Sequence, residues 1–314
     1  MSTTVCVAPI MAALVGTEDI LGVGRLWKPQ NQNQERIVEL LKLRDQLNVF
    51  FQKTAEGELG HKELRYWVDW VAENLNKILR EEGFGIQLKD FKKGEFGVVS
   101  ILDVLVEWLI KGQEDEIIAD GVVYPAVRMG ATGRVDGQYT QLVEVFESSR
   151  HPHPVGMLRT KTGDKVYVTV AEKKGHAEWP PKDFALYLAI EYIRRDLNTS
   201  PGEWAGMIFP MVDINDRPDI SWLIGMNTID QQGNYAEVSQ ALQQTKFKMN
   251  QYGARVKSAV AIGVTITAVR HKPQWLIIDE PFYLWIERDG VSFPIVGMYV
   301  DPSDWKDPGD LHNM

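Results

Sequence analysis

Two short histidine-containing segments could supply metal ligands or proton-transfer groups. His176-Ala-Glu178, followed by Pro180, has the residue order that opens the zinc-deaminase signature, in which His binds the metal and Glu transfers protons. The cysteine pair that must follow is missing, so this zinc site is excluded. His151 and His153 lie in a His-Pro-His-Pro run, where proline favours an extended backbone and no third ligand is near. A surface loop is the favoured interpretation, and we predict no metal site.

Glycine and nucleophile motifs are also incomplete. Gly22 and Gly24 begin a pattern like the dinucleotide-binding fingerprint, but no third glycine follows, so a plain turn is expected. The sequence contains no Walker A loop, no His-Glu-x-x-His motif and no Gly-x-Ser-x-Gly elbow. We therefore predict a protein that is not an enzyme, with no catalytic residues and no cofactor. A carboxylate site assembled from distant positions is a lesser alternative that motifs do not test.

The composition is that of a globular protein. Of the 314 residues, 44% are hydrophobic and 25% are charged, which supports a sizeable core. The formal net charge of −9 disfavours binding to nucleic-acid phosphates. Cys6 is the only cysteine, which excludes an intrachain disulfide and fits a reducing, cytoplasmic location. The apolar stretch 5–15 is shorter than the roughly 20 residues that cross a membrane, so a buried strand or helix is expected, with a secretory signal as the lesser alternative.

The elements of the first third are predicted to be mainly helical. An apolar stripe that follows residues 31–34 predicts an amphipathic helix and consists of Ile37, Leu40, Leu41, Leu47 and Phe50. A second set at three- and four-residue spacing predicts a helix that ends at Gly83 and consists of Leu64, Trp67, Val68, Val71, Leu75, Ile78 and Leu79. Ser100 and Asp103 form a capping box that predicts a third, short helix up to Gly112.

The pattern then changes to sheet. Short β-prone runs, separated by turns with glycine and proline, predict strands between about residues 114 and 181. Asp183 is expected to cap a helix that ends before a Pro-Gly pair. The predicted fold class is α+β. We predict a single domain, 1–314, with a mainly helical part, 1–113, and a β-rich part, 114–314.

An apolar hairpin pattern lies near the end of the sequence. Leu276 to Ile286 is an extended run that contains Pro-Phe, and after a turn at Asp289-Gly290 a second strand runs from Phe293 to Pro302. Pro-Phe between β-branched neighbours is also typical of any buried hairpin. The positions singled out in this hairpin are Asp279, Pro281, Phe282, Gly297 and Pro302.

Four segments in this order resemble the C-terminal part of a serpin. Besides the two hairpin strands, residues 238–253 have the spacing of the strand that enters the family's reactive-loop hinge. Residues 208–214 are similar to the family's proline-containing strand before its last helix. The resemblance covers about residues 204–305. It implies a serpin-like fold, in which N-terminal helices pack on mixed or antiparallel β-sheets and a β-hairpin closes the chain.

Several positions depart from the family pattern. Glu280 stands where the family favours a basic or small polar residue, and Gln243 stands where His is usual. Gln251-Tyr252 replaces an acidic pair, and the family's Asn-Ala strand motif is not found in the middle of the chain. Over the first 200 residues, only the order of helices and then sheet supports the fold.

The resemblance implies a suicide-substrate inhibitor, in which a protease cleaves an exposed loop that then inserts as a new strand into a central sheet. Period-two alternation predicts a half-buried strand over residues 254–269. Burial of its Val and Ile side chains would favour permanent insertion by about 10 kcal/mol before chain entropy. We therefore expect a non-inhibitory serpin-like protein that binds a protein partner, with this strand already inserted. The hinge residues of the strand are Gly253, Ala254, Val256, Ser258 and Val260.

The alternative is an active inhibitor of a trypsin-like serine protease. Arg270-His271 lies just before Pro273, where the family's scissile bond usually falls, whereas counting from the hinge glycine places that bond near Thr267-Ala268. The partner is then a serine protease. Neither version involves nucleic acid or a membrane, and the oligomeric state is not predicted. A scaffold subunit that binds a partner through its N-terminal helices is a further possibility.

Overall fold

The largest sheet joins strands from both ends of the chain. In the computed structural model, which describes residues 1–22, 27–51, 63–104, 106–172, 179–197, 203–254 and 274–311, it has six strands. In spatial order these are β1 (Thr3–Val5), β20 (Val296–Val300), β19 (Phe282–Glu287), β11 (Lys165–Val170), β10 (His151–Arg159) and β9 (Val143–Ser148). All neighbouring pairs are antiparallel.

A second sheet has four strands, in which β18 (Gln274–Ile277) is parallel to its neighbour β12 and the other pairs are antiparallel. Its remaining strands are β12 (Trp204–Pro210), β6 (Val122–Gly130) and β5 (Gln113–Ala119). Five smaller pairs are β2 (Leu64–Asp69) with β3 (Gly97–Leu102), β4 (Val106–Glu107) with β17 (Gly253–Ala254), β13 (Val212–Asp216) with β16 (Thr245–Met249), β14 (Asn227–Ile229) with β15 (Tyr235–Glu237), and β7 (Thr132–Val135) with β8 (Gln138–Gln141).

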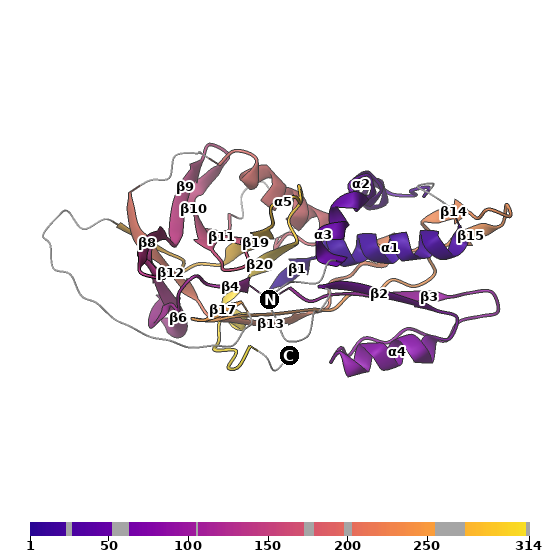
Figure 1. Ribbon diagram of the computed structural model, residues 1–314, viewed down its shortest axis with the longest axis horizontal. Coiled ribbons are helices and arrows are strands. Elements are labelled where there is room, and N and C mark those ends of the chain that lie inside the picture. The colour runs from indigo at the N-terminus through magenta and orange to yellow at the C-terminus, as the bar shows by residue number, and fades with distance from the viewer. Residues whose placement is uncertain are drawn as a thin grey trace, which may run out of the picture.

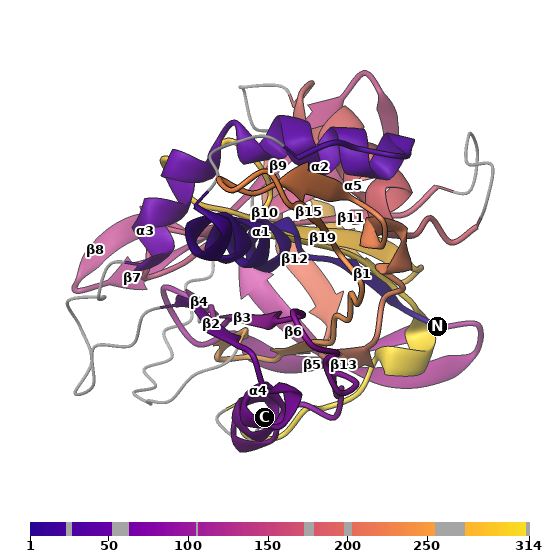
Figure 2. The ribbon, with the colours of Figure 1, turned by 90° about the vertical axis from the view of Figure 1, so that its right-hand side faces the viewer.

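The helices cover these sheets. They are α1 (Val7–Leu21), α2 (Gln32–Leu41), α3 (Asn48–Phe51), α4 (Ala72–Glu81) and α5 (Asp183–Arg194), together with the 3-10 turns η1 (Arg44–Leu47), η2 (Ser221–Leu223) and η3 (Pro302–Asp304). Figure 1 shows α1, β2 and β3 running side by side away from the six-stranded sheet, against which α5 packs. Figure 2, seen along this direction, places β2 and β3 between α1 and α4.

Several sequence predictions are confirmed. The apolar stretch 5–15 forms the end of β1 and most of α1, which is largely buried. Asn31 caps α2 by accepting a hydrogen bond from the Gln34 amide, at 3.0 Å. Sheet follows residue 113, and β19 and β20 form the expected antiparallel hairpin. The helix expected near residue 183 is α5, but its N-cap position is Lys182, so Asp183 is the first helical residue and not the cap. The α+β class is therefore correct.

Two predicted helices are wrong in part. Residues 64–69 form β2, and the helix that follows begins only at Ala72. The supposed capping box at Ser100 lies inside β3, which pairs with β2 along its whole length. The apolar spacing of residues 64–71 fits the helical period, but the long-range pairing of β2 with β3 favours strands rich in Val, Ile, Tyr and Trp and prevails.

Candidate functional site

The hinge begins with a tight turn between β16 and β17. The Asn250 amide donates to the Gly253 carbonyl oxygen at 2.9 Å, and the Gly253 amide donates back to the Asn250 carbonyl at 3.3 Å. The side-chain oxygen of Asn250 accepts from the Tyr252 amide at 2.9 Å. The buried indole N–H of Trp108 donates to the Asn250 carbonyl at 2.9 Å. This turn therefore has a fixed shape.

Gly253 and Ala254 leave the turn as a short strand beside β4. Gly253 lies opposite Glu107, and Ala254, which is 5% exposed, lies opposite Val106 in antiparallel register. At Gly253 φ is 155°, and a Cβ atom there would lie 2.4 Å from the Val106 carbonyl oxygen, so only glycine fits without displacement. The first two predicted hinge residues are thus paired in a sheet. The other three, Val256, Ser258 and Val260, lie outside the described residues.

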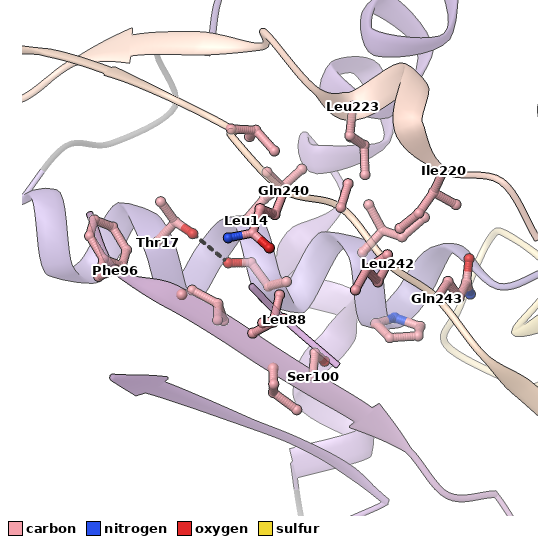
Figure 3. A pocket seen from close by; sticks show the side chains of 18 of the residues that line it. Leu14, Thr17, Leu88, Phe96, Ser100, Ile220, Leu223, Gln240, Leu242 and Gln243 are labelled. Carbon is pink, nitrogen blue, oxygen red and sulfur yellow. Dashed lines mark hydrogen bonds between the residues drawn. The ribbon is translucent and has the colours of Figure 1, made fainter. Parts of the chain in front are cut away.

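A cleft of about 680 Å³ lies in line with this short strand. Its floor is α1, and its two sides are β3 and residues 238–246. Figure 3 shows Leu14 and Thr17 on the floor and Ser100 on the β3 side, with Gln240 and Leu242 opposite. Most of the lining is apolar, which is typical of a site that takes an apolar occupant.

The two sides of the cleft can accept a further strand. Among the described residues β3 pairs with β2 alone, so alternate backbone N–H and C=O groups on its other edge face the cleft. The opposite residues, 238–244, form neither helix nor strand. The Ser100 hydroxyl is buried, and within the described part of the chain it has no hydrogen-bond partner. Edges of this kind are templates for β-strand addition.

The direction of the side chains on β3 follows from their contacts. Tyr66, which pairs with Ser100, donates a hydrogen bond from its hydroxyl to Asp19 on α1 at 2.9 Å. Even-numbered positions of β3 therefore face α1. Val99 and Ile101 face the opposite way. Together with Leu75 and Leu79 of α4 they form a small cluster of buried apolar side chains.

The side formed by residues 238–246 and the start of β16 shows the same alternation. Phe247 and Met249 are buried in the main core. Gln243, where the family usually has His, donates to the Cys6 carbonyl at the start of α1, at 3.2 Å. Gln244 and Lys246 contact the connector between α4 and β3 instead. Odd-numbered positions on this side thus face the core.

The hairpin positions occupy a different part of the molecule from the hinge. Phe282 is fully buried at the start of β19, whereas Asp279 is exposed and Pro281 is half-buried just before it. Gly297 in β20 packs against α5, where a Cβ atom would lie 2.5 Å from Cδ1 of Ile190. Pro302 opens η3. Phe282 and Gly297 thus lie in the six-stranded sheet, and the other three positions flank its strands β19 and β20.

Some candidate residues are corrected and others lie outside the described ranges. His151 is buried in β10, not in a surface loop, and burial is the main cause that lowers its pKa. Its Nε2 lies 2.8 Å from the Val170 carbonyl oxygen, a contact that a histidine in a strand interior can make. Arg270, His271, Thr267 and Ala268, like His176 and Glu178, lie outside the described residues.

Two kinds of site are absent from the described residues. No three His, Cys, Asp or Glu side chains in the described ranges come together as metal ligands would. No helix within these ranges combines the length and the apolar character needed to cross a membrane.

Motif reasoning did not find the cleft. Its lining comes from α1, the connector 82–96, β3 and residues 220–246, which are far apart in the sequence. The one sequence signal related to it was the alternating segment after Gly253, because a predicted strand must pair with the edge of a sheet and β3 has such an edge at the cleft.

The comparisons with known proteins identify the fold. No family model and no curated protein matches the sequence. Solved serpin structures match nearly the whole chain. Serpin48 of the insect Tenebrio molitor is 13% identical, with a TM-score of 0.55, and the match covers 95% of this chain and 91% of that one. Mouse protein-Z dependent protease inhibitor is 13% identical, with a TM-score of 0.56, and the match covers 96% of this chain and 91% of that one. Human thyroxine-binding globulin, in complex with thyroxine, is 12% identical, with a TM-score of 0.58, and the match covers 96% of this chain and 92% of that one. The chain therefore has a divergent serpin-like fold, as the resemblance implied.

Proposed function

We propose that this protein is a non-enzymatic, non-inhibitory serpin-like protein that binds a protein partner, with residues 254–269 inserted as a strand in the cleft. The observation that carries the proposal is the antiparallel pairing of Gly253 and Ala254 with β4, at the end of the cleft. An inhibitor of this fold needs the segment to stay outside the sheet until a protease cleaves it. A segment that is inserted at rest has no such stored energy to release.

The register of the paired residues supports insertion along β3. If the pairing of Ala254 with Val106 continues unchanged, Val260 lies opposite Ser100 and Ile262 lies opposite Val98. Because the even positions of β3 face α1, the β-branched side chains of the even-numbered segment residues also face the apolar floor. The inserted strand would cover the unpaired edge of β3.

The register on the other side agrees. The turn pairs Asn250 with Gly253, which by continuation places Val256 opposite Phe247 and Ser258 opposite Thr245. Phe247 is buried in the core, so this second register also directs the even-numbered residues inward. Two independent pairings thus give the same inward face.

The middle of the outward face of the strand, after Lys257, would consist of small residues. Ala259, Ala261 and Gly263 would lie beneath the connector between α4 and β3, whose apolar side chains include Ile86 and Leu88. Each buried Val or Ile contributes roughly 1.5 to 3 kcal/mol, so the inward face favours insertion at rest.

Active inhibition is the second candidate, and the open cleft favours it. A cleft that is free in the resting protein could take the segment after cleavage at Arg270-His271 or Thr267-Ala268, and the partner would then be a serine protease.

Incubation with trypsin separates the two functions. We expect simple cleavage or no reaction, with no complex that survives SDS electrophoresis. The Arg270→Ala variant is the control for cleavage at that bond. An SDS-stable covalent complex that forms with the wild-type protein and is lost in the variant would establish the inhibitor and end the non-inhibitory proposal.

Two further features of the proposal concern the whole chain. We propose a single domain, because one cluster of buried side chains includes α1, the six-stranded sheet and β12.

We also propose a reducing, cytoplasmic setting, in which the only thiol is inert. Burial raises the pKa of the Cys6 thiol to about 12, so this side chain stays protonated.

A further inference from the structure

The connector between α4 and β3, residues 82–96, covers the outer side of the cleft. Its side chains alternate in the stretch 84–89: Phe84, Ile86 and Leu88 are half-buried, whereas the residues between them are exposed. The three apolar side chains pack on the cluster shared by α4 and β3. They also line the cleft, and Figure 3 shows Leu88 and Gln240 at this cavity. The connector is thus an extended segment with an apolar underside.

Side-chain amides, not a neighbouring strand, bond the backbone of this connector. The Gly85 amide donates to Oε1 of Gln244 at 2.8 Å. The Lys89 amide donates to Oε1 of Gln240 at 2.8 Å, and Nε2 of Gln240 donates to the Lys89 carbonyl at 3.1 Å. The carboxamide therefore bonds both backbone groups of one residue, as a paired strand would.

The other side of the connector is bonded in the same way. Asn76 of α4 donates from Nδ2 to the Leu88 carbonyl at 2.9 Å, and its Oδ1 accepts from the Leu88 amide at 2.8 Å. Asn76 is buried, and α4 packs on β2 and β3. The connector is thus bonded at Leu88 to the β3 side of the cleft and at Gly85 and Lys89 to the opposite side.

We propose that Gln240 and Gln244 form a latch that holds the two sides of the cleft at a fixed separation through the connector. Rupture of the three hydrogen bonds between these glutamines and the connector frees residues 238–244 to move away from β3, while Lys246 at the start of β16 stays bonded to the Gly83 carbonyl. The latch deepens the proposed function, because it would control how easily a strand enters or leaves the cleft. The hydrogen exchange of the amides that form its bonds, however, can be measured whether or not a strand lies in the cleft.

Hydrogen exchange of the full-length protein, followed by mass spectrometry, tests the latch. In the double variant Gln240→Ala/Gln244→Ala we expect the amides of residues 84–91 to exchange at least about tenfold faster than in the wild type, because the Gly85 and Lys89 amides lose their acceptors and the connector loses its bonds to residues 238–246. Residues 238–246 should also exchange faster. β19 and β20 should keep wild-type protection, which shows that the variant is folded.

Two further variants make the comparison specific. Gln46→Ala is the matched control, because Gln46 also bonds a distant backbone amide, that of Ser292 at 2.9 Å, away from the cleft. It should leave the exchange of residues 84–91 unchanged. Gln240→Glu keeps an acceptor for the Lys89 amide but loses the donor to the Lys89 carbonyl, so an intermediate rate is expected.

The outcomes separate the latch from the inserted strand. Wild-type exchange of residues 84–91 in the double variant would overturn the latch. Fast exchange of the cleft-facing β3 amides in the wild-type protein would contradict the inserted strand and leave the latch result intact.

Discussion

Gly253 is the residue on which the geometry of the hinge depends. Its φ of 155° and its contact with the Val106 carbonyl let β17 leave the turn directly into pairing with β4. The hinge spacing in the sequence predicted this glycine, because the turn and the alternating segment after it are local signals.

Replacement of Gly253 by Ala should destabilise the protein by about 2 to 3 kcal/mol, since the new Cβ would meet the Val106 carbonyl and strain the backbone. Unfolding in denaturant measures this change. The matched control is Gly163→Ala, where φ is 86° and no atom lies within 4 Å of a new Cβ, so that only the backbone cost of about 1 to 2 kcal/mol applies. Equal losses in the two variants would mean that β17 is not held against β4.

The contacts of single polar residues could not be predicted from the sequence. Gln240 and Gln244 stand in a stretch without periodicity, so nothing in the sequence pairs them with residues 85 and 89. Ser100 was interpreted as a helix cap because Ser and Asp at three-residue spacing form caps, whereas its hydroxyl faces a cleft. Such roles depend on contacts between distant segments.

Among the elements, β2 and β3 differ most from the prediction. The spacing of Leu64, Trp67, Val68 and Val71 fits one face of a helix, but Tyr66, Trp67 and Val68 are residue types that favour strands. Pairing with β3 decides in favour of the strand, and no local signal contains that information. α5 was predicted correctly because its apolar stripe continues over several turns. The helix predicted after residues 31–34 is right only up to Leu41, where α2 ends, and Leu47 and Phe50 lie in η1 and α3 instead.

A buried ion cluster connects three loops next to these elements. Arg288, after β19, donates from Nε to Asp164 at 2.7 Å and from Nη2 to Asp164 at 2.8 Å. It also bonds Glu63, before β2, including one contact of 2.9 Å from Nη2. The Asp164 side chain is fully buried, so its charge depends on the guanidinium.

The Arg288→Met variant should therefore lose about 3 to 5 kcal/mol of stability, because it leaves two carboxylates without their cation. Chemical denaturation provides the measurement. As a control, Lys165→Met removes the ion pair with the exposed Asp289 and should cost no more than about 1 kcal/mol. A loss for Arg288→Met as small as that of the control would show that the cluster is not a stabilising connection.

At the scale of the whole molecule, the fold was predicted from the last third of the sequence. Four segments in order predicted the serpin-like fold, and the solved structures that match about 95% of the chain confirm it. The first 200 residues predicted only helices followed by sheet. Their pairing partners, such as β20 for β1, are too distant for local patterns to identify.

The state of the whole fold can be tested by heating. If residues 254–269 are already inserted, cleavage by trypsin after Arg270 should change the free energy of unfolding by less than about 1 kcal/mol. This corresponds to roughly 2 to 4 °C in Tm. Thermal unfolding before and after cleavage measures this, with Arg270→Ala as the control for the cleaved bond. A gain above about 10 °C would mean that the resting protein is metastable, contrary to the proposed function.

The pairing of β1 with β20 has a consequence for biosynthesis. Thr3 pairs with Tyr299 and Val5 with Gly297, so β1 meets its neighbour only after almost 300 further residues have been made. Until then the apolar helix that follows β1 lacks part of its final cover. The nascent chain is therefore expected to need shielding by chaperones throughout translation, and to complete its largest sheet only afterwards.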